Sequence, residues 1–337
     1  MRDRAISGPA TKSSLVRKIF LLFVMLAAPG LVRAQVGGLP GPQAPPPPPP
    51  PQLKDQTHAG IRVSTDLVLL HVTVMDERGQ FVPGLKQNNF RVFEDKVEQK
   101  ISAFLGEDVP VTMGLVIDNS GSMREKRSQV NAAALTFIKT SNPQDEVFVV
   151  NFNDEYYLDL DKDFTNDQRE LNEALSRIDA RGSTALFDAV IGSLDHLRKG
   201  HKDKKVLLVI TDGGDTVSKV DYKEAVRAAQ QAEAILYCII VVPIESSAGR
   251  DTGGEHALIQ LSEDTGGKYF YATSVPQLDD AFRQISDELR TQYLLAYYPS
   301  QRLSDSDFRR IQVVVAGLPA DRFKVRHRTG YYTSKSH

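Results

Sequence analysis

VTMGLVIDNSGSM, residues 111–123, joins an apolar run to a cluster of oxygen-bearing side chains. Residues 111–117 carry no charge, which predicts a strand buried on both faces, as in a parallel sheet covered by helices. Asp118, Ser120 and Ser122 follow at every second position. Open α/β sheets bind ligands beyond the carboxyl ends of their strands, and hard oxygen ligands suit Mg²⁺. The stretch therefore predicts an α/β fold with a candidate metal site.

Two later stretches repeat this arrangement. KVLLVI, residues 205–210, runs directly into TDGGD, residues 211–215, which places Asp212 at the end of a second buried strand. Between the two strands lies RGSTAL, residues 181–186, where Thr184 directly precedes a helical pattern. The start of a helix has free backbone amides that favour anionic ligands nearby. We therefore expect three loops to converge on one ion.

The three loops together resemble the metal-ion-dependent adhesion site of von Willebrand factor type A domains. D-x-S-x-S, then a threonine in a G-x-T loop, then T-D-G occur here in the same order and with matching spacing. The resemblance implies a bound Mg²⁺, or Mn²⁺ or Ca²⁺ in its place. In that family the serines and the threonine bind the ion directly, and the aspartates often act through water. The implied ligands are Asp118, Ser120, Ser122, Thr184 and Asp212.

The resemblance also implies what such a site binds. An ion with few direct carboxylate ligands stays under-neutralised, and its open position favours an Asp or Glu carboxylate from a partner protein. We therefore expect a protein-binding or adhesion module without catalytic activity. Asp215 is a further carboxylate in the third loop. We expect it to cap the following helix or to brace the loop behind the ligands.

Other function classes remain as alternatives. A metal-dependent hydrolase acting at the cell envelope is one. A serine hydrolase with Ser120 or Ser122 as nucleophile is a second, although no histidine lies in a recognisable catalytic motif to act as its base. An ion that only holds the three loops together is another. A haloacid-dehalogenase-type phosphotransferase would need a second aspartate where Ser120 stands. The formal net charge of −2 gives no argument for nucleic acid, and the chain shows no zinc-ligand spacing or glycine-rich phosphate loop.

The amino-terminal region has the pattern of an export signal. Basic residues precede the apolar run IFLLFVMLAAPGLV at residues 19–32, and the small residues of Val32-Arg33-Ala34 suit a cleavage site. The run is shorter than the roughly 20 residues that span a bilayer, so an uncleaved anchor is the alternative. We expect a signal peptide over residues 1–34, a proline-rich linker over residues 35–57, no later membrane span, and a secreted or periplasmic protein.

Alternating strand and helix patterns fill residues 109–292 and predict a doubly wound, mostly parallel sheet. Cys238, the only cysteine, lies in the apolar run ILYCIIVV and is expected to be a buried strand residue. Strands are expected at residues 111–117, 146–152, 156–160, 205–210, 235–242 and 268–271, and helices around residues 130–138, 171–178, 186–197, 222–232, 255–263 and 276–292.

Residues 58–108 and 293–334 show short β patterns instead, and the first segment resembles the β-rich region before the type A domain in a family of exported acidobacterial proteins. Three or four strands make only a marginal sheet. We therefore expect both segments to form one small β-sandwich split around the α/β domain. A separate carboxyl-terminal β unit is the alternative. Strands are expected at residues 65–75, 90–93, 99–104, 293–298, 309–315 and 323–328.

Overall fold

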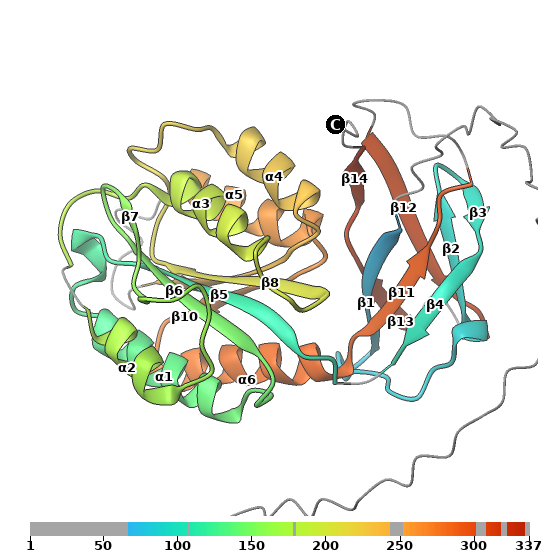
Figure 1. Cartoon of the computed structure of the whole chain (residues 1–337), viewed down its shortest axis with the longest axis horizontal. Helices are drawn as coiled ribbons and strands as arrows, with labels where there is room; N and C mark the ends of the chain where they lie inside the picture. Colours follow the sequence, from blue (N-terminus) through green and yellow to red (C-terminus); the bar gives the residue numbers. More distant parts are fainter. Residues whose placement is uncertain are drawn as a thin grey trace, which may run out of the picture. The chain divides into compact units, whose positions relative to one another are not determined.

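A six-stranded sheet forms the centre of the α/β domain (Figure 1). Its strands are β5 Val111–Asp118, β6 Glu146–Phe152, β7 Tyr156–Leu158, β8 Lys204–Thr211, β9 Ile235–Val241 and β10 Tyr269–Ala272. The strand order is β10-β9-β8-β5-β6-β7, and every pair is parallel except β6 with β7. The predicted doubly wound sheet with an antiparallel edge strand is therefore confirmed. This computed structural model describes residues 67–333 except 107, 178–179, 243–251, 301–307 and 318–321.

Helices cover both faces of the central sheet (Figure 1). One face carries α1 (Arg127–Thr140), α2 (Gln168–Ser176) and α6 (Val275–Thr291), and the other carries α3 (Leu186–Leu197), α4 (Tyr222–Gln231) and α5 (Thr252–Asp264). Every residue of β5 is buried, with Leu115 in one core and Val116 in the other. Two covered faces explain why this strand carries no charge before Asp118.

The remaining strands form a β-sandwich of two four-stranded antiparallel sheets. They are β1 Val68–Asp76, β2 Phe90–Glu94, β3 Val97–Gln99, β4 Ile101–Leu105, β11 Tyr293–Tyr297, β12 Phe308–Val315, β13 Phe323–Arg326 and β14 Gly330–Tyr332. One sheet has the order β13-β1-β11-β4 and the other β14-β12-β2-β3. Each sheet combines strands from before and after the α/β domain, so the sandwich is split around that domain, as expected.

The single strand expected over residues 99–104 is wrong. β3 ends at Gln99 and pairs with β2, whereas β4 begins at Ile101 and pairs with β11 in the other sheet. The chain therefore crosses between the two sheets at Lys100. A short β pattern in the sequence indicates an extended segment, but it does not show which distant strand that segment pairs with. The crossing between sheets therefore could not be predicted from residues 99–104 alone. β14 was not expected from the sequence.

Cys238 is fully buried in β9, as expected, and burial raises the pKa of its thiol to about 12. The signal peptide and the proline-rich linker lie outside the described residues. Within the described ranges, no helix has both the length and the apolar character needed to cross a bilayer.

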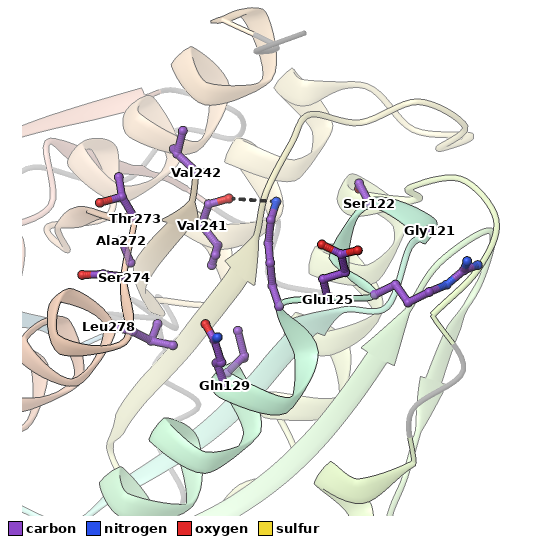
Figure 2. A pocket seen from close by; sticks show the side chains of 13 residues that line it. Gly121, Ser122, Glu125, Gln129, Val241, Val242, Ala272, Thr273, Ser274 and Leu278 are labelled. Carbon is purple, nitrogen blue, oxygen red and sulfur yellow. Dashed lines mark hydrogen bonds between the residues drawn. The ribbon is translucent and has the colours of Figure 1, made fainter. Parts of the chain in front are cut away.

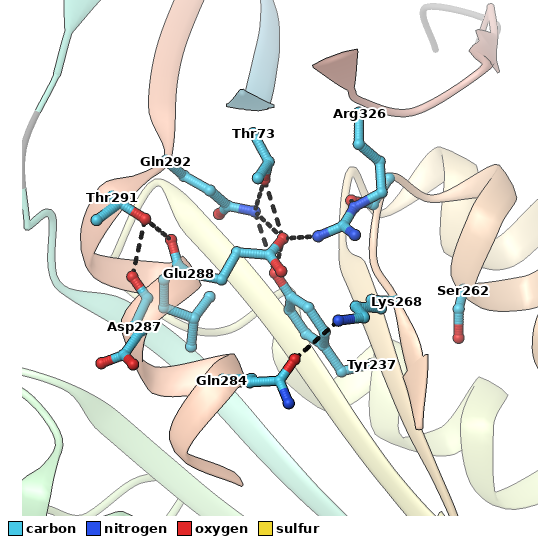
Figure 3. A network of polar contacts seen from close by, with 12 residues as sticks. Thr73, Tyr237, Ser262, Lys268, Gln284, Asp287, Glu288, Thr291, Gln292 and Arg326 are labelled. Atoms are coloured by element: carbon cyan, nitrogen blue, oxygen red, sulfur yellow. Dashed lines mark hydrogen bonds and ion pairs between the residues drawn. The ribbon is translucent and has the colours of Figure 1, made fainter. Parts of the chain in front are cut away.

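A buried polar network joins the α/β domain to the sandwich (Figure 3). Glu288 on α6 is 1% exposed, and its Oε1 accepts hydrogen bonds from Thr73 of β1 at 2.9 Å and from Tyr237 of β9 at 2.8 Å. The same oxygen pairs with the Arg326 guanidinium of β13. The last helix of the α/β domain is therefore fixed to two strands of the sandwich.

Candidate metal centre

Three loops meet at the carboxyl edge of the central sheet. We call them loop 1 (residues 118–123, after β5), loop 2 (residues 181–185, before α3) and loop 3 (residues 211–216, after β8). β5 and β8 are neighbouring parallel strands, so loops 1 and 3 start side by side. This is the edge at which open α/β sheets bind ligands.

Backbone hydrogen bonds hold loop 2 against both of the other loops. The Gly121 amide of loop 1 donates to the Gly182 carbonyl oxygen at 3.2 Å. The Thr216 amide of loop 3 donates to the Thr184 carbonyl oxygen at 2.9 Å, and the Thr184 amide donates to the Thr216 hydroxyl at 2.8 Å. The predicted convergence of three loops is thus present, and it rests on direct contacts within the chain.

Asp118 is fully buried at the base of loop 1. Its Oδ1 accepts from the Ser120 amide at 2.7 Å, and its Oδ2 accepts from the Thr211 hydroxyl at 2.6 Å. Burial raises the pKa of the carboxyl, although the hydrogen bonds from Thr211 and Ser120 oppose this shift. The charged carboxylate is therefore incompletely stabilised by the protein alone, and a neighbouring cation would offset its desolvation.

The side chains of Ser120, Ser122 and Asp212 form a chain of contacts. The two serine hydroxyl oxygens lie 3.1 Å apart, and the Ser122 hydroxyl donates to Asp212 Oδ1 at 2.9 Å. Mg²⁺ holds its ligands in a near-octahedron at about 2.1 Å, so adjacent ligand oxygens lie about 3 Å apart. Each of the two observed distances therefore fits an edge of such a coordination shell.

Thr184, the fifth predicted ligand, is 7% exposed. Its backbone contacts with loop 3 place it beside the other candidate ligands. Gly182 shapes the loop that presents it. Its φ is +73°, and a Cβ at this position would lie 2.2 Å from Asp154 Oδ2. Asp154 Oδ1 accepts from the Ser183 amide at 2.8 Å. Only glycine fits this left-handed, closely packed turn, which fixes the course of loop 2.

Asp215 braces loop 3 and does not cap the helix that follows it. Its Oδ1 accepts from the Phe187 amide in the first turn of α3 at 3.3 Å, and its Oδ2 accepts from the Ser218 amide at 3.2 Å. The cap of the following helix α4 is Asp221, which accepts from the Glu224 amide at 2.9 Å. Of the two roles expected for Asp215, the structure shows the bracing role.

Two basic side chains at the start of α1 also border the loops, and the sequence interpretation missed both. The Lys126 ammonium donates to Asp212 Oδ2 at 2.5 Å. Arg127 is fully buried behind loop 1 and donates to Asn119 Oδ1 at 3.3 Å, and burial lowers its pKa to about 10. Cations at a helix start oppose the helix dipole, and the first turn of α1 has no acidic residue. Two basic residues at the start of a helix without an acidic residue are the sequence feature that would have identified Lys126 and Arg127.

A cavity of about 560 Å³ adjoins loop 1 (Figure 2). It lies between the start of α1 and the region where β9, β10 and the first turn of α6 meet. Ser122 belongs both to the cavity lining and to the oxygen chain of loop 1. A ligand that reaches these oxygens therefore also reaches the cavity. The apolar part of the lining consists of Val130, Val241, Val242, Ala272 and Leu278.

The donor set decides which metals suit this centre. In the part of the chain that the structure describes, no three or more His, Cys, Asp or Glu side chains are grouped so that they could hold a metal ion. The five predicted ligands instead offer two carboxylates and three hydroxyls. Zinc and copper prefer sulfur and imidazole, whereas Mg²⁺, Mn²⁺ and Ca²⁺ accept carboxylate, hydroxyl and water oxygens. The residues present fit a hard dication and do not fit zinc.

A known protein family matches the part of the chain that carries these loops. Residues 113–214 match the family model of the von Willebrand factor type A domain. This range includes loops 1 and 2, the first part of loop 3 and all five predicted ligands. No curated protein matches the sequence.

Solved structures of similar fold come from several bacteria. A von Willebrand factor type A protein from Catenulispora acidiphila is 12% identical over 81% of this chain and 74% of its own, with a TM-score of 0.49. The corresponding domain of a type V pilus tip protein from Porphyromonas gingivalis is 14% identical over 53% of this chain and 94% of its own, with a TM-score of 0.43. An aerotolerance-related membrane protein from Bacteroides fragilis is 16% identical over 53% and 98%, also with a TM-score of 0.43.

Proposed function

The chain contains a von Willebrand factor type A domain, and we propose that this domain binds an acidic side chain of a partner protein through a divalent cation held by loops 1, 2 and 3. We further propose that the protein acts outside the cytoplasm, in the periplasm or after secretion, on the basis of the signal-like segment over residues 1–34. The domain type supports the coarser statement, a protein-interaction module.

One observation carries the proposal: at the ligand-binding edge of the sheet, the Ser122 hydroxyl oxygen lies 3.1 Å from that of Ser120 and 2.9 Å from Asp212 Oδ1. Asp118 and Asp212 would hold the cation, and the hydroxyls of Ser120, Ser122 and Thr184 would complete its protein ligands. When bound, the cation supplies positive charge at an open position facing the partner. Within the chain, Thr211 orients Asp118, and the contacts of loop 2 with the other loops keep the donors in place.

Two observations favour this function over the alternatives. The loops are joined by hydrogen bonds between Gly121 and Gly182 and between Thr184 and Thr216, which hold them together within the chain itself. Among the described contacts, the hydroxyls of Ser120 and Ser122 pair with each other and with Asp212, and none pairs with a histidine base. A serine nucleophile of the usual kind requires such a base.

The first prediction concerns Asp118→Asn, which keeps the shape of the side chain and removes its charge. We expect its affinity for Mn²⁺ to fall at least about tenfold, because a buried anionic ligand is lost. Calorimetric titration measures this, and the melting temperature, recorded alongside it, reports that the fold is kept. Pull-down from the native cell envelope with and without EDTA then tests for a partner, which should be captured only with the dication and only by the unmodified chain.

Asp161→Asn is the matched control, because Asp161 is an exposed aspartate outside the three loops. It should bind Mn²⁺ like the unmodified chain. If the unmodified chain takes up neither Mg²⁺ nor Mn²⁺, the proposed function is wrong. If EDTA lowers the melting temperature but changes no partner binding, the ion has only a structural role.

A further inference from the structure

Lys126 lies where the candidate metal centre meets the cavity of Figure 2. Its ammonium is 2.5 Å from Asp212 Oδ2 and 3.4 Å from the Val241 carbonyl oxygen. The Lys126 side chain is 20% exposed and that of Asp212 only 6%. Water therefore screens this ion pair much less than it screens a surface pair. The protein thus places a cation of its own on one of the two carboxylates that would hold the metal.

The charges around the centre show the consequence. Asp118 and Asp212 contribute two negative charges and Lys126 contributes one positive charge, which leaves a net charge of −1 among these three groups. A dication raises that sum to +1. Without Lys126 the same ion would bring the sum to zero. The buried Arg127, whose charge interacts with Asp118, adds the same +1 to every state compared here. The lysine therefore makes entry of a dication less favourable and leaves the loaded centre attractive to an anion.

The wall of the cavity holds a second hydrogen-bond acceptor for the Lys126 ammonium. Lys126, Ser122 and Val241 all line it, so the flexible lysine stem already runs along its wall. The Val241 carbonyl oxygen, an acceptor that does not belong to the three loops, lies on the cavity side. A dication on Asp212 can therefore displace the ammonium toward Val241 without removing its charge from the neighbourhood of the centre.

We propose that Lys126 is an internal counter-cation that weakens dication binding by the empty centre and strengthens the binding of an acidic guest to the loaded centre. This rests on the proposed function, and it makes Lys126 a specificity-determining residue, because a neutral guest gains nothing from the extra positive charge. The partner surface that fits is one where an Asp or Glu carboxylate reaches the metal and no basic residue approaches the cavity rim.

Lys126→Met tests the inference with two probes that should respond in opposite directions. Methionine keeps most of the stem that lines the cavity and removes the charge. The affinity for Mn²⁺ alone, measured by calorimetry, should rise about tenfold or more, since a unit charge within several Å of a dication is removed from a partly buried site. The affinity of the Mn²⁺-loaded protein for acetate, measured by water relaxation at constant ionic strength, should fall about threefold or more. A purely structural role for Lys126 would weaken both.

Two control variants complete the experiment. Lys126→Arg keeps the charge and should change each affinity much less than Lys126→Met. Lys139→Met removes the same charge from an exposed position in the last turn of α1 and should change neither. Unchanged or weaker Mn²⁺ binding by Lys126→Met, or unchanged acetate binding, overturns the inference while the proposed function stands. If neither the unmodified chain nor Lys126→Met binds Mn²⁺, both fall.

Discussion

Replacing Glu288 by alanine is expected to destabilise the folded chain by about 3–5 kcal/mol, the range for breaking a buried ion pair by removing one partner. Glu288 Oε1 accepts from Thr73 at 2.9 Å, from Tyr237 at 2.8 Å and from Gln292 at 3.2 Å, and it pairs with Arg326 (Figure 3). Alanine leaves a largely buried guanidinium without its counter-charge and two buried hydroxyls without this acceptor. Urea denaturation followed by circular dichroism measures the loss.

The matched control is Asp280→Ala on the same helix. Asp280 forms an exposed ion pair with Arg283, one turn away, and such pairs contribute little. The expected change is within about 0.5 kcal/mol. Glu288→Gln should fall between the two variants, because the amide oxygen still accepts hydrogen bonds but no longer neutralises Arg326. A loss below about 1 kcal/mol for Glu288→Ala would show that the network does not support the junction between the two domains.

Lys204 is expected to make the stability of the chain rise with pH between about 7 and 10. Its side chain is 2% exposed, and its ammonium donates to the Leu289 carbonyl oxygen at 2.6 Å. Burial lowers its pKa from 10.5 to about 7, against the opposing influence of Glu288, Asp108 and Asp145. The unfolded chain therefore binds more protons than the folded chain between these values. The destabilisation is fully present below pH 7 and disappears as the pH rises toward 10.5.

The measurement compares Lys204→Met with the unmodified chain across that pH range, because all other titrating groups are common to both. The free energy of unfolding of Lys204→Met, relative to the unmodified chain, should fall by on the order of 3 kcal/mol from pH 7 to pH 10. Lys223→Met, an exposed substitution on α4, should show no such slope. A pH-independent difference for Lys204→Met would mean that Lys204 stays charged in the folded protein at all these pH values.

Local pattern was enough to find the candidate ligands. Residues 111–117 are uncharged because both faces of β5 are covered, and the polar cluster begins where that cover ends. Asp118, Ser120 and Ser122 are close in sequence, so their spacing on one loop is visible in the chain. Thr184 and Asp212 stand where similar loop patterns recur, and the resemblance to a known arrangement grouped them with the first three residues. The hydrogen bonds between the loops show why they belong to the same edge.

Contacts between distant segments determined the position of Lys126 and the crossing of the chain between sheets, which local sequence patterns could not predict. The sequence interpretation did not single out Lys126, because only the fold brings its ammonium to Asp212, 86 positions later. The crossing of the chain between sheets at Lys100 was invisible for the same reason, since it depends on β11, which lies almost 200 residues further along.

The sequence by itself determined most of the strands and helices, the α/β class and the loops that carry the candidate ligands, because periodicity and composition depend on neighbours in the chain. Only the tertiary structure decided how the two β segments pair, which carboxylate carries a lysine and where the buried network lies. Thr73 and Glu288, for example, form a hydrogen bond across 215 positions. Such contacts depend on the packing of distant segments, which no short stretch of sequence records.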